Sequence, residues 1–250
     1  MNFESVYAGK MTTPTRKDTS APAQASSRAD IDAFLNKVKS LGPAATAGKR
    51  GRLIFALDAT MSRQPTWDSA CALQADMFRE AASIGGLDIQ LVYFRGLSEC
   101  RASGWVAGAD KLAALMQRIT CQGGHTQIGK VLSHARQEQA RQPVQALVFV
   151  GDAMEEGIDS LAHAAGELGL LGVPVFMFQE GGDPVAENAY REIARLSRGA
   201  YCRFDTGSAA QLAELLRAVA AYAAGGMKAL AALSARNAGG ARLLLAQLKS

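Results

Sequence analysis

Residues 53–62 read LIFALDATMS, and residues 146–152 read ALVFVGD. Each segment is a short, continuous apolar run that leads into an aspartate, Asp58 in the first and Asp152 in the second. Continuous apolar strands between helices are typical of a parallel sheet that is covered on both faces, because both faces of each strand are then buried. The two segments therefore predict strands of an α/β sheet, each with a carboxylate at its end.

The sequence around these two runs alternates between strand and helix patterns. Further strands are predicted at residues 87–95, 101–106, 173–178 and 201–204. Helices are predicted at residues 67–84, 111–119, 127–142, 159–171, 186–197 and 212–222. This order predicts a doubly wound, mostly parallel central sheet with helices on both faces. The short, polar strand at 101–106 is expected at an edge of the sheet and antiparallel to its neighbour.

Composition divides the chain into four predicted regions. They are a flexible tail at 1–28, a helix and linker at 29–50, the α/β domain at 51–224 and a helical extension at 225–250. The tail is rich in Ser, Thr, Pro and Ala and cannot bury enough apolar surface to offset the entropy of ordering. The extension begins at Gly225-Gly226, where the helical pattern is expected to break.

The distribution of charged residues argues against nucleic acid and membrane as partners. Residues 1–50 carry eight basic and four acidic side chains, whereas residues 51–250 carry 19 of each. The α/β domain therefore lacks the basic excess of a nucleic-acid-binding surface, and we expect no nucleic-acid partner. The uncharged stretch at 168–179 has 12 residues, whereas a membrane span needs about 20. We therefore expect no membrane segment.

The cysteine and histidine pattern favours a reducing compartment. The four cysteines form no Cys-x-x-Cys pair and are not interpreted as forming a metal-binding motif with the three histidines. A zinc site built from Cys and His is therefore not expected. Because the N-terminus also lacks the apolar block of a secretory signal, we expect reduced thiols and a cytoplasmic location.

Oxygen-bearing side chains gather where the predicted strands end. The residues are Asp58, Thr60, Ser62, Thr126 and Asp152. Doubly wound sheets bind ligands outside the carboxyl ends of their strands, where the strand order reverses. Two carboxylates and three hydroxyls are hard donors that suit Mg²⁺, with Mn²⁺ or Ca²⁺ as alternatives, rather than Zn²⁺. Glycines 123 and 124, just before Thr126, would let that loop approach closely.

Other interpretations of these residues stay open. Asp58 and Asp152 could merely cap the helices that follow them. Asp58 could also be the nucleophile of a haloacid-dehalogenase-like phosphotransferase, but Thr60 stands where such enzymes carry an acid/base aspartate. Glu155 and Glu156 are expected to stabilise the N-terminus of the helix that follows them, through their negative charge.

The pattern Asp58-x-Thr60-x-Ser62, then Thr126, then Asp152, resembles the metal-ion-dependent adhesion site (MIDAS) of von Willebrand factor type A (VWA) domains. The resemblance, which is strongest to bacterial members, covers roughly residues 52–222 and departs at Thr60, where serine is usual. It implies a Rossmann-like fold and an ion bound directly by the three hydroxyl residues, with both aspartates acting through water. It also implies that a partner's Asp or Glu completes the coordination of the ion.

The resemblance leads us to expect a divalent-metal-dependent protein-binding module without catalytic residues. Integrin-type members couple docking to movement of the last helix, which here would be residues 209–223. Two other functions stay open. One is a metal-dependent hydrolase of a phosphate or ester, for which only Glu155, Glu156 and His125 offer nearby bases. The other is an accessory subunit of an ATPase machine.

Overall fold

The computed structural model describes residues 50–82, 85–205, 208–236 and 239–248. The predicted tail at 1–28, and the predicted helix and linker at 29–50 except its last residue, lie outside the described residues. These two predictions therefore stay predictions.

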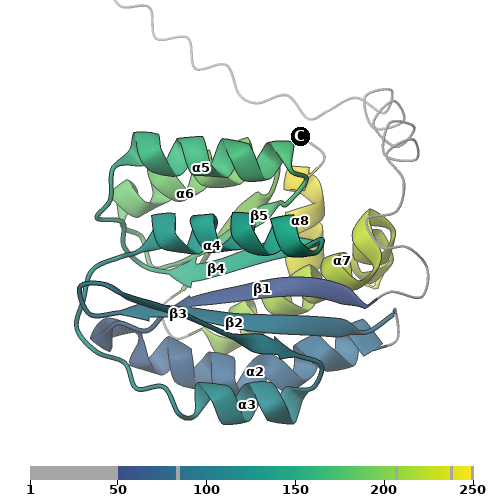
Figure 1. The fold of residues 1–250 in the computed structure, drawn as a ribbon. Helices are drawn as coiled ribbons and strands as arrows, with labels where there is room; N and C mark the ends of the chain where they lie inside the picture. The colour runs from purple at the N-terminus through teal and green to yellow at the C-terminus, as the bar shows by residue number, and fades with distance from the viewer. Residues whose placement is uncertain (1–49, 83–84, 206–207, 237–238, 249–250) are drawn as a thin grey trace, which may run out of the picture. The chain divides into compact units, whose positions relative to one another are not determined.

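Six strands form one sheet in the order β3-β2-β1-β4-β5-β6 (Figure 1). The strands are β1 (Gly51–Asp58), β2 (Leu87–Arg95), β3 (Glu99–Val106), β4 (Ala146–Gly151), β5 (Val175–Glu180) and β6 (Ala200–Phe204). Neighbouring strands run parallel except β3, which is antiparallel to β2 at the sheet edge. The predicted doubly wound sheet, with its antiparallel edge strand, is confirmed.

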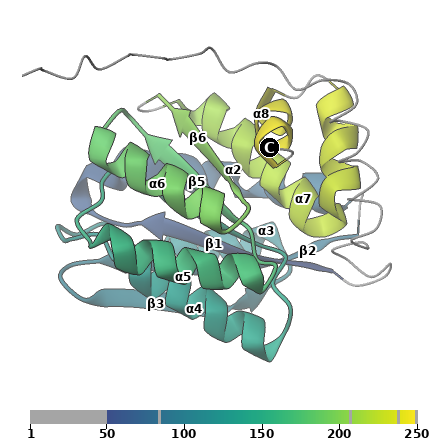
Figure 2. The ribbon, with the colours of Figure 1, turned by 90° about the horizontal axis from the view of Figure 1, so that it is seen from above.

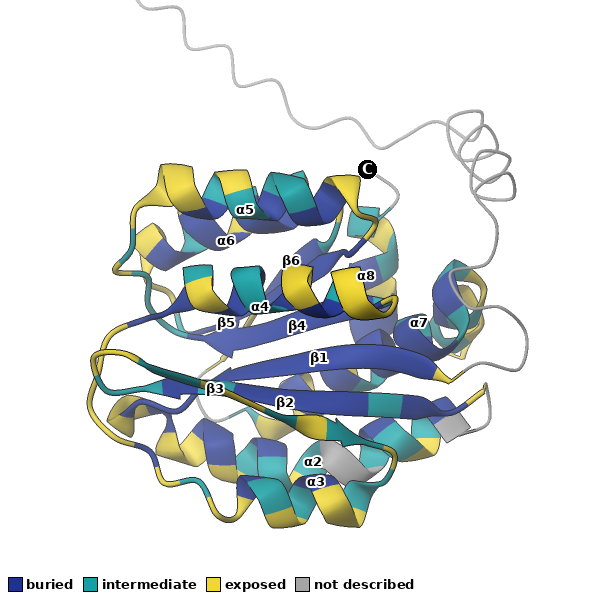
Figure 3. Cartoon of the chain, viewed as in Figure 1, coloured by how far each residue is buried: buried dark blue, intermediate teal, exposed yellow. Residues whose placement is uncertain are grey.

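Helices cover both faces of the sheet (Figures 1 and 2). On one face lie α2 (Gln64–Ala82), α3 (Ala109–Met116), α7 (Ala209–Ala235) and α8 (Gly239–Leu248). On the other lie α4 (Ile128–Arg141), α5 (Ile158–Leu170) and α6 (Pro184–Leu196). Alternate residues of β1 enter the two cores, and the strand is buried along its whole length (Figure 3). This burial on both sides is why its sequence is continuously apolar.

The strand order reverses between β1 and β4, which lie side by side with Leu57 opposite Val150. The chain leaves β1 toward α2 on one face and leaves β4 toward α5 on the other. Two connections that diverge in this way open a crevice at the carboxyl ends of the strands. Asp58 ends β1 and Asp152 directly follows β4, so both carboxylates lie at this switch point.

Helix α7 contains the break expected at the glycine pair, since Gly226 has a φ of 64° within an otherwise helical segment. By length and composition this helix could cross a membrane, so the uncharged stretch at 168–179 was the wrong segment on which to judge membrane spans. Half of the apolar window of α7 is buried, 50%, and Leu216 and Val219 lie in the core beneath the sheet. Core helices of soluble proteins also pass such a test.

The outer edge of β6 is covered by a side chain of α8. The amide of Gln247 accepts a hydrogen bond from the backbone N–H of Tyr201 at 2.6 Å and donates one to the carbonyl of the same residue. These are the two bonds that a further strand residue would make with an edge strand. Gln247 therefore takes the place of a neighbouring strand at this position.

Candidate metal site

The loop after β1 folds around the carboxylate of Asp58. This side chain is 3% exposed and accepts a hydrogen bond of 2.7 Å from the backbone N–H of Thr60. A bond from a carboxylate to the N–H two residues on is an Asx turn, which tightens a loop. The following residues, Met61–Arg63, form a 3₁₀ turn before α2. Asp58 thus shapes the loop and caps no helix.

The turn brings two hydroxyls and the second aspartate together. Thr60 Oγ1 lies 3.3 Å from Ser62 Oγ, and Ser62 Oγ donates to Asp152 Oδ2 at 3.4 Å. Four of the five predicted residues therefore form one chain of contacts across the switch point. Asp152 caps no helix either, because α5 begins after Gly157. The side chain of Asp152 is 31% exposed, so the site opens to solvent on the β4 side.

Thr126 is held at the same edge of the sheet by two hydrogen bonds with Glu155. Its backbone N–H donates to Glu155 Oε2 at 3.0 Å, and its Oγ1 accepts from the backbone N–H of Glu155, also at 3.0 Å. The hydrogen bond from Thr126 is the main cause that lowers the pKa of the Glu155 carboxyl. This reciprocal pair fastens the loop before α4 to the loop after β4, three residues beyond Asp152.

The role expected for Glu156 was wrong. Its carboxylate accepts hydrogen bonds from the backbone N–H groups of Ile128 and Gly129, at 2.5 and 3.0 Å. These groups belong to the first turn of α4, whereas Glu156 precedes α5. The carboxylate therefore caps a helix that precedes it by 28 residues, and it joins two loops instead of stabilising its own helix.

Gly124 is needed for the placement of the Thr126 loop. A Cβ at Gly124 would lie 2.2 Å from the carbonyl oxygen of Gly96, closer than any side chain tolerates. The next residue, His125, donates its backbone N–H to that same carbonyl at 3.1 Å. Gly124 thus permits the close approach that the sequence suggested for the glycine pair, and the approach is to the turn after β2, whereas a Cβ at Gly123 would meet no atom within 4 Å.

Burial dominates the electrostatics of Asp58. The pKa of this carboxyl is raised to about 6, mainly by burial and to a smaller extent by the nearby charge of Asp152. Hydrogen bonds from Thr60 and the charge of Arg63 act in the opposite direction. The balance shows that the positive charge around Asp58 does not fully offset its desolvation. A divalent cation would supply that charge.

Sequence reasoning missed a buried ion pair that borders the site. The side chains of Arg63 and Glu180 are 3% and 4% exposed, and their charged groups contact each other directly. Thr66 also donates its hydroxyl to Glu180. A third contact joins Arg63 Nη1 to Asp152 Oδ2 at 3.7 Å. Glu180 ends β5, so the strand-end rule that selected Asp58 would have selected it too, had the strand been predicted two residues longer.

Tyr190 supports the backbone just after Asp152. Its hydroxyl donates to the carbonyl of Ala153 at 2.8 Å, and its ring packs edge-on against Phe149. Burial holds the pKa of Tyr190 well above its usual value, so the hydroxyl remains a donor. A Cβ at Gly151 would lie 2.8 Å from this hydroxyl, which explains why a glycine precedes Asp152.

The donor set fits a hard divalent cation. Oxygen-bearing side chains of Asp58, Thr60, Ser62 and Asp152 follow one another in a chain of contacts, and Thr126 is bonded to Glu155 in the loop that follows Asp152. Among the described residues, no three His, Cys, Asp or Glu side chains gather as a metal cluster. An ion here would therefore depend on the hydroxyls and on water. Mg²⁺ and Mn²⁺ accept such a set, because they favour oxygen ligands and Mg²⁺ commonly keeps several waters.

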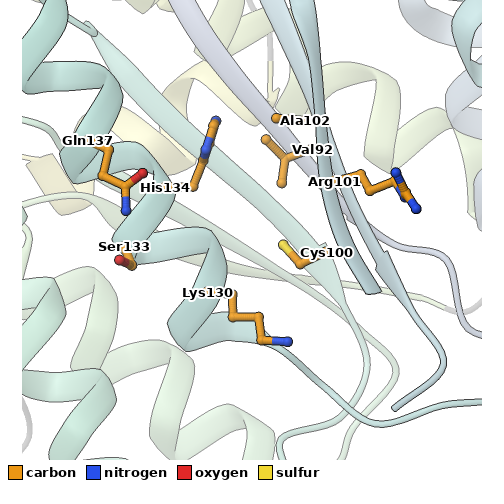
Figure 4. A pocket seen from close by; sticks show the side chains of 8 residues that line it. All are labelled: Val92, Cys100, Arg101, Ala102, Lys130, Ser133, His134 and Gln137. Atoms are coloured by element: carbon orange, nitrogen blue, oxygen red, sulfur yellow. The ribbon is translucent and has the colours of Figure 1, made fainter. Parts of the chain in front are cut away.

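A separate cavity of about 270 Å³ lies between α4 and the strands β2 and β3 (Figure 4). Lys130, Ser133, His134 and Gln137 line it from the helix, opposite Cys100. Two of its polar groups are engaged, since His134 Nε2 lies 2.8 Å from Gln90 Oε1 and Lys130 Nζ donates to Ser98 and Gln127. None of the five predicted metal-binding residues lines this cavity.

Comparisons with known proteins support the fold. No family model and no curated protein matches this sequence. Among solved structures, a von Willebrand factor type A protein from Catenulispora acidiphila is 18% identical, with a TM-score of 0.56 over 70% of this chain and 43% of that chain. Proximal thread matrix protein 1 from the mussel byssus, with a zinc-occupied MIDAS motif, is 17% identical, with a TM-score of 0.55 over 77% and 51%.

A pilus adhesin, SpaC from Lactobacillus rhamnosus GG in an open conformation, is 9% identical. Its TM-score is 0.56, over 72% of this chain and 30% of that chain. Identities at this level carry information on fold alone. The chain therefore has the fold of a von Willebrand factor type A domain.

Proposed function

We propose that this chain is a divalent-cation-dependent protein-binding module, and that it binds its partner without catalysing a reaction. In this proposal Asp58, Thr60, Ser62, Thr126 and Asp152 hold Mg²⁺ or Mn²⁺, and an Asp or Glu of the partner completes the coordination. The observation that carries the proposal is the continuous chain of contacts from Asp58 through Thr60 and Ser62 to Asp152 at the switch point.

The chemistry of the hydroxyl ligands explains why such an ion would bind a partner. An ion held mainly by neutral oxygens and water keeps most of its positive charge, so it attracts a further anionic ligand. Asp152 is partly exposed, and the site is therefore open on the side from which a carboxylate would arrive. The MIDAS of the mussel thread protein is described as zinc-occupied, which supports metal binding on this fold.

Apolar side chains around the site favour a protein as the partner. Seven large apolar side chains are exposed among the described residues, and four of them lie at the carboxyl edge of the sheet. They are Met61 at 63%, Leu97 at 79%, Ile158 at 38% and Val185 at 53% exposure. They follow β1, β2, β4 and β5 in turn. Apolar side chains around a polar centre are typical of a contact surface for another protein.

We also propose a cytoplasmic location, on the chemistry of the thiols. Cys71, Cys100, Cys121 and Cys202 form no disulfide. A chain that keeps four cysteines as thiols fits a reducing compartment.

Calorimetric titration of the full chain with MnCl₂ tests the ion. We expect saturable binding of one Mn²⁺ and a loss of affinity of at least 100-fold in Asp152→Ala. Asp159→Ala is the matched control, because Asp159 is an exposed acid in the first turn of α5 and should bind Mn²⁺ as the wild type does. Equal binding by the wild type and Asp152→Ala would refute the site.

Affinity capture tests the partner. The wild type, with and without EDTA, is compared with Asp152→Ala, and the proposal requires a protein retained by the metal-loaded wild type alone. Retention of the same protein in all three conditions would contradict metal-dependent binding.

A further inference from the structure

Arg63 places a fixed positive charge beside the candidate metal site. It directly follows Ser62, and its guanidinium contacts Glu180 and lies 3.7 Å from Asp152 Oδ2. The side chain is 3% exposed, so solvent screens its charge little. Within the described residues, its Nε and Nη2 are buried without a hydrogen-bond partner.

This arrangement is a poor way to stabilise a fold. A buried ion pair offsets its desolvation only when further hydrogen bonds satisfy its remaining polar atoms, and apolar side chains of similar size often stabilise as well or better. Arg63 leaves two of its three nitrogens unsatisfied. Buried polar atoms of this kind call for an explanation other than stability. The neighbouring aspartates supply one.

Formal charges show what Arg63 changes. The charged group consists of the side chains of Asp58, Asp152, Glu180 and Arg63. Its three ionised carboxylates carry three negative charges, and Arg63 reduces the net charge of the group to −2. A divalent cation then makes the group neutral, and an incoming carboxylate meets no net repulsion. Without Arg63, the group would hold the cation more tightly but remain at −1, which opposes an anionic ligand.

We propose that Arg63 is the built-in counter-charge of the metal site, which weakens ion binding and strengthens capture of a carboxylate ligand. The proposal rests on the function proposed above and deepens it, because it assigns the balance between the two affinities to one residue. Arg63 touches Asp152 and Glu180 rather than the ion, and so acts through charge. Glu180 holds the guanidinium in place and partly offsets it.

Mn²⁺ titration of the wild type and four variants tests the first half of the proposal. We expect Arg63→Met to bind Mn²⁺ about tenfold more tightly than the wild type, and Glu180→Gln about tenfold more weakly. The double variant Arg63→Met/Glu180→Gln restores the net charge of −2 and is expected within threefold of the wild type. Arg63→Lys, which keeps the charge, serves as the matched control and is also expected within threefold.

Acetate, as the smallest carboxylate probe, tests the second half. Displacement of water from protein-bound Mn²⁺ is followed by water-proton relaxation as acetate is added. We expect the acetate affinity of Arg63→Met to fall at least fivefold and that of the double variant to match the wild type. An unchanged acetate affinity in Arg63→Met overturns the assignment of ligand capture to Arg63.

The outcomes separate this inference from the proposed function. Equal Mn²⁺ affinities in the wild type and Arg63→Met overturn the inference alone. If Arg63→Met binds Mn²⁺ and the wild type does not, the inference stands and the proposed function fails; if no variant binds, both fail. Thermal unfolding shows which variants fold. Should Arg63→Met not fold, Glu180→Gln and the double variant decide, because a purely structural role does not predict that removing Arg63 as well restores the Mn²⁺ affinity lost in Glu180→Gln.

Discussion

Two buried arginine–glutamate pairs lie at opposite ends of the sheet and differ in how well they are satisfied. At the start of β1, Arg52 donates to the carbonyls of Gln142 and Pro143 and to Glu138. Its guanidinium also stacks 3.8 Å from the ring centre of Trp105. Glu138 accepts further hydrogen bonds from Trp105 and Arg141.

At the carboxyl end, Arg63 contacts Glu180 and Asp152 and leaves Nε and Nη2 without partners in the described chain. Both arginines are buried, so burial alone does not separate a structural ion pair from a functional one. The number of satisfied polar atoms does. Among the described residues, the pair at the start of β1 leaves no buried side-chain nitrogen or oxygen without a hydrogen-bond partner. The pair at the candidate site leaves two nitrogens of Arg63 without partners beside Asp152.

The largest effect is expected from breaking the pair at the start of β1. Arg52→Met leaves Glu138 without its buried counter-charge and should lower the free energy of unfolding by about 3–5 kcal/mol. Its Mn²⁺ affinity should stay within twofold of the wild type. Chemical denaturation and calorimetry measure the two quantities. The control is Arg50→Met, since the exposed pair of Arg50 with Asp88 should contribute no more than about 1 kcal/mol. A change in Mn²⁺ affinity in Arg52→Met would remove the distinction between the two ends.

Asp58→Asn tests the candidate metal site at the carboxyl end of the sheet. The pKa of Asp58 is raised to about 6 in the folded, metal-free protein, so the folded state keeps a proton that the unfolded chain releases near pH 4. Stability of the wild type should therefore fall as the pH rises from about 4 to 6, by on the order of 2 kcal/mol.

Asparagine mimics the protonated carboxyl and keeps the oxygen that accepts from Thr60. The variant should thus be more stable than the wild type at pH 7, equal to it near pH 4, and unable to bind Mn²⁺. Denaturant titrations at both pH values, without metal, measure this. A variant that is less stable at pH 7 would mean that Asp58 is a structural residue.

The smallest effect is expected in the loops that join the site to the helices. Glu156→Ala removes the carboxylate that caps Ile128 and Gly129 at the start of α4, and should cost about 1–2 kcal/mol. Mn²⁺ affinity should change less than threefold. Asp159→Ala again provides the control for an exposed acid. A large loss of Mn²⁺ affinity would show that Glu156 belongs to the metal site.

The sequence predicted the fold well because the strands are buried on both faces. Burial on both sides makes a strand continuously apolar, and such runs stand out between helical patterns, as in β1 and β4. The ends of elements were less certain. The strand β5 was expected at residues 173–178, whereas it spans Val175–Glu180. That small shift concealed a buried carboxylate two strands from Asp58.

Parts of the site could not be predicted, because they depend on contacts between distant loops. Asp58, Thr60 and Ser62 are close in sequence, so their convergence follows from one turn. Three contacts join segments 27 or more residues apart: the bond between Thr126 and Glu155, the cap that Glu156 provides to α4, and the contact of Arg63 with Glu180. A charge after a strand indicates an edge of the sheet but does not show which partner it meets there.

The hydrogen bonds between the Gln247 amide of α8 and the backbone of β6 affect how readily the molecule can self-associate. An unsatisfied edge strand invites pairing with another chain, and here a single side chain on the C-terminal helix blocks that pairing at Tyr201. Helix α8 therefore hinders strand-to-strand self-association at the edge of β6. Removal of residues 239–248 would leave the backbone of Tyr201 open to pairing with a strand of another chain.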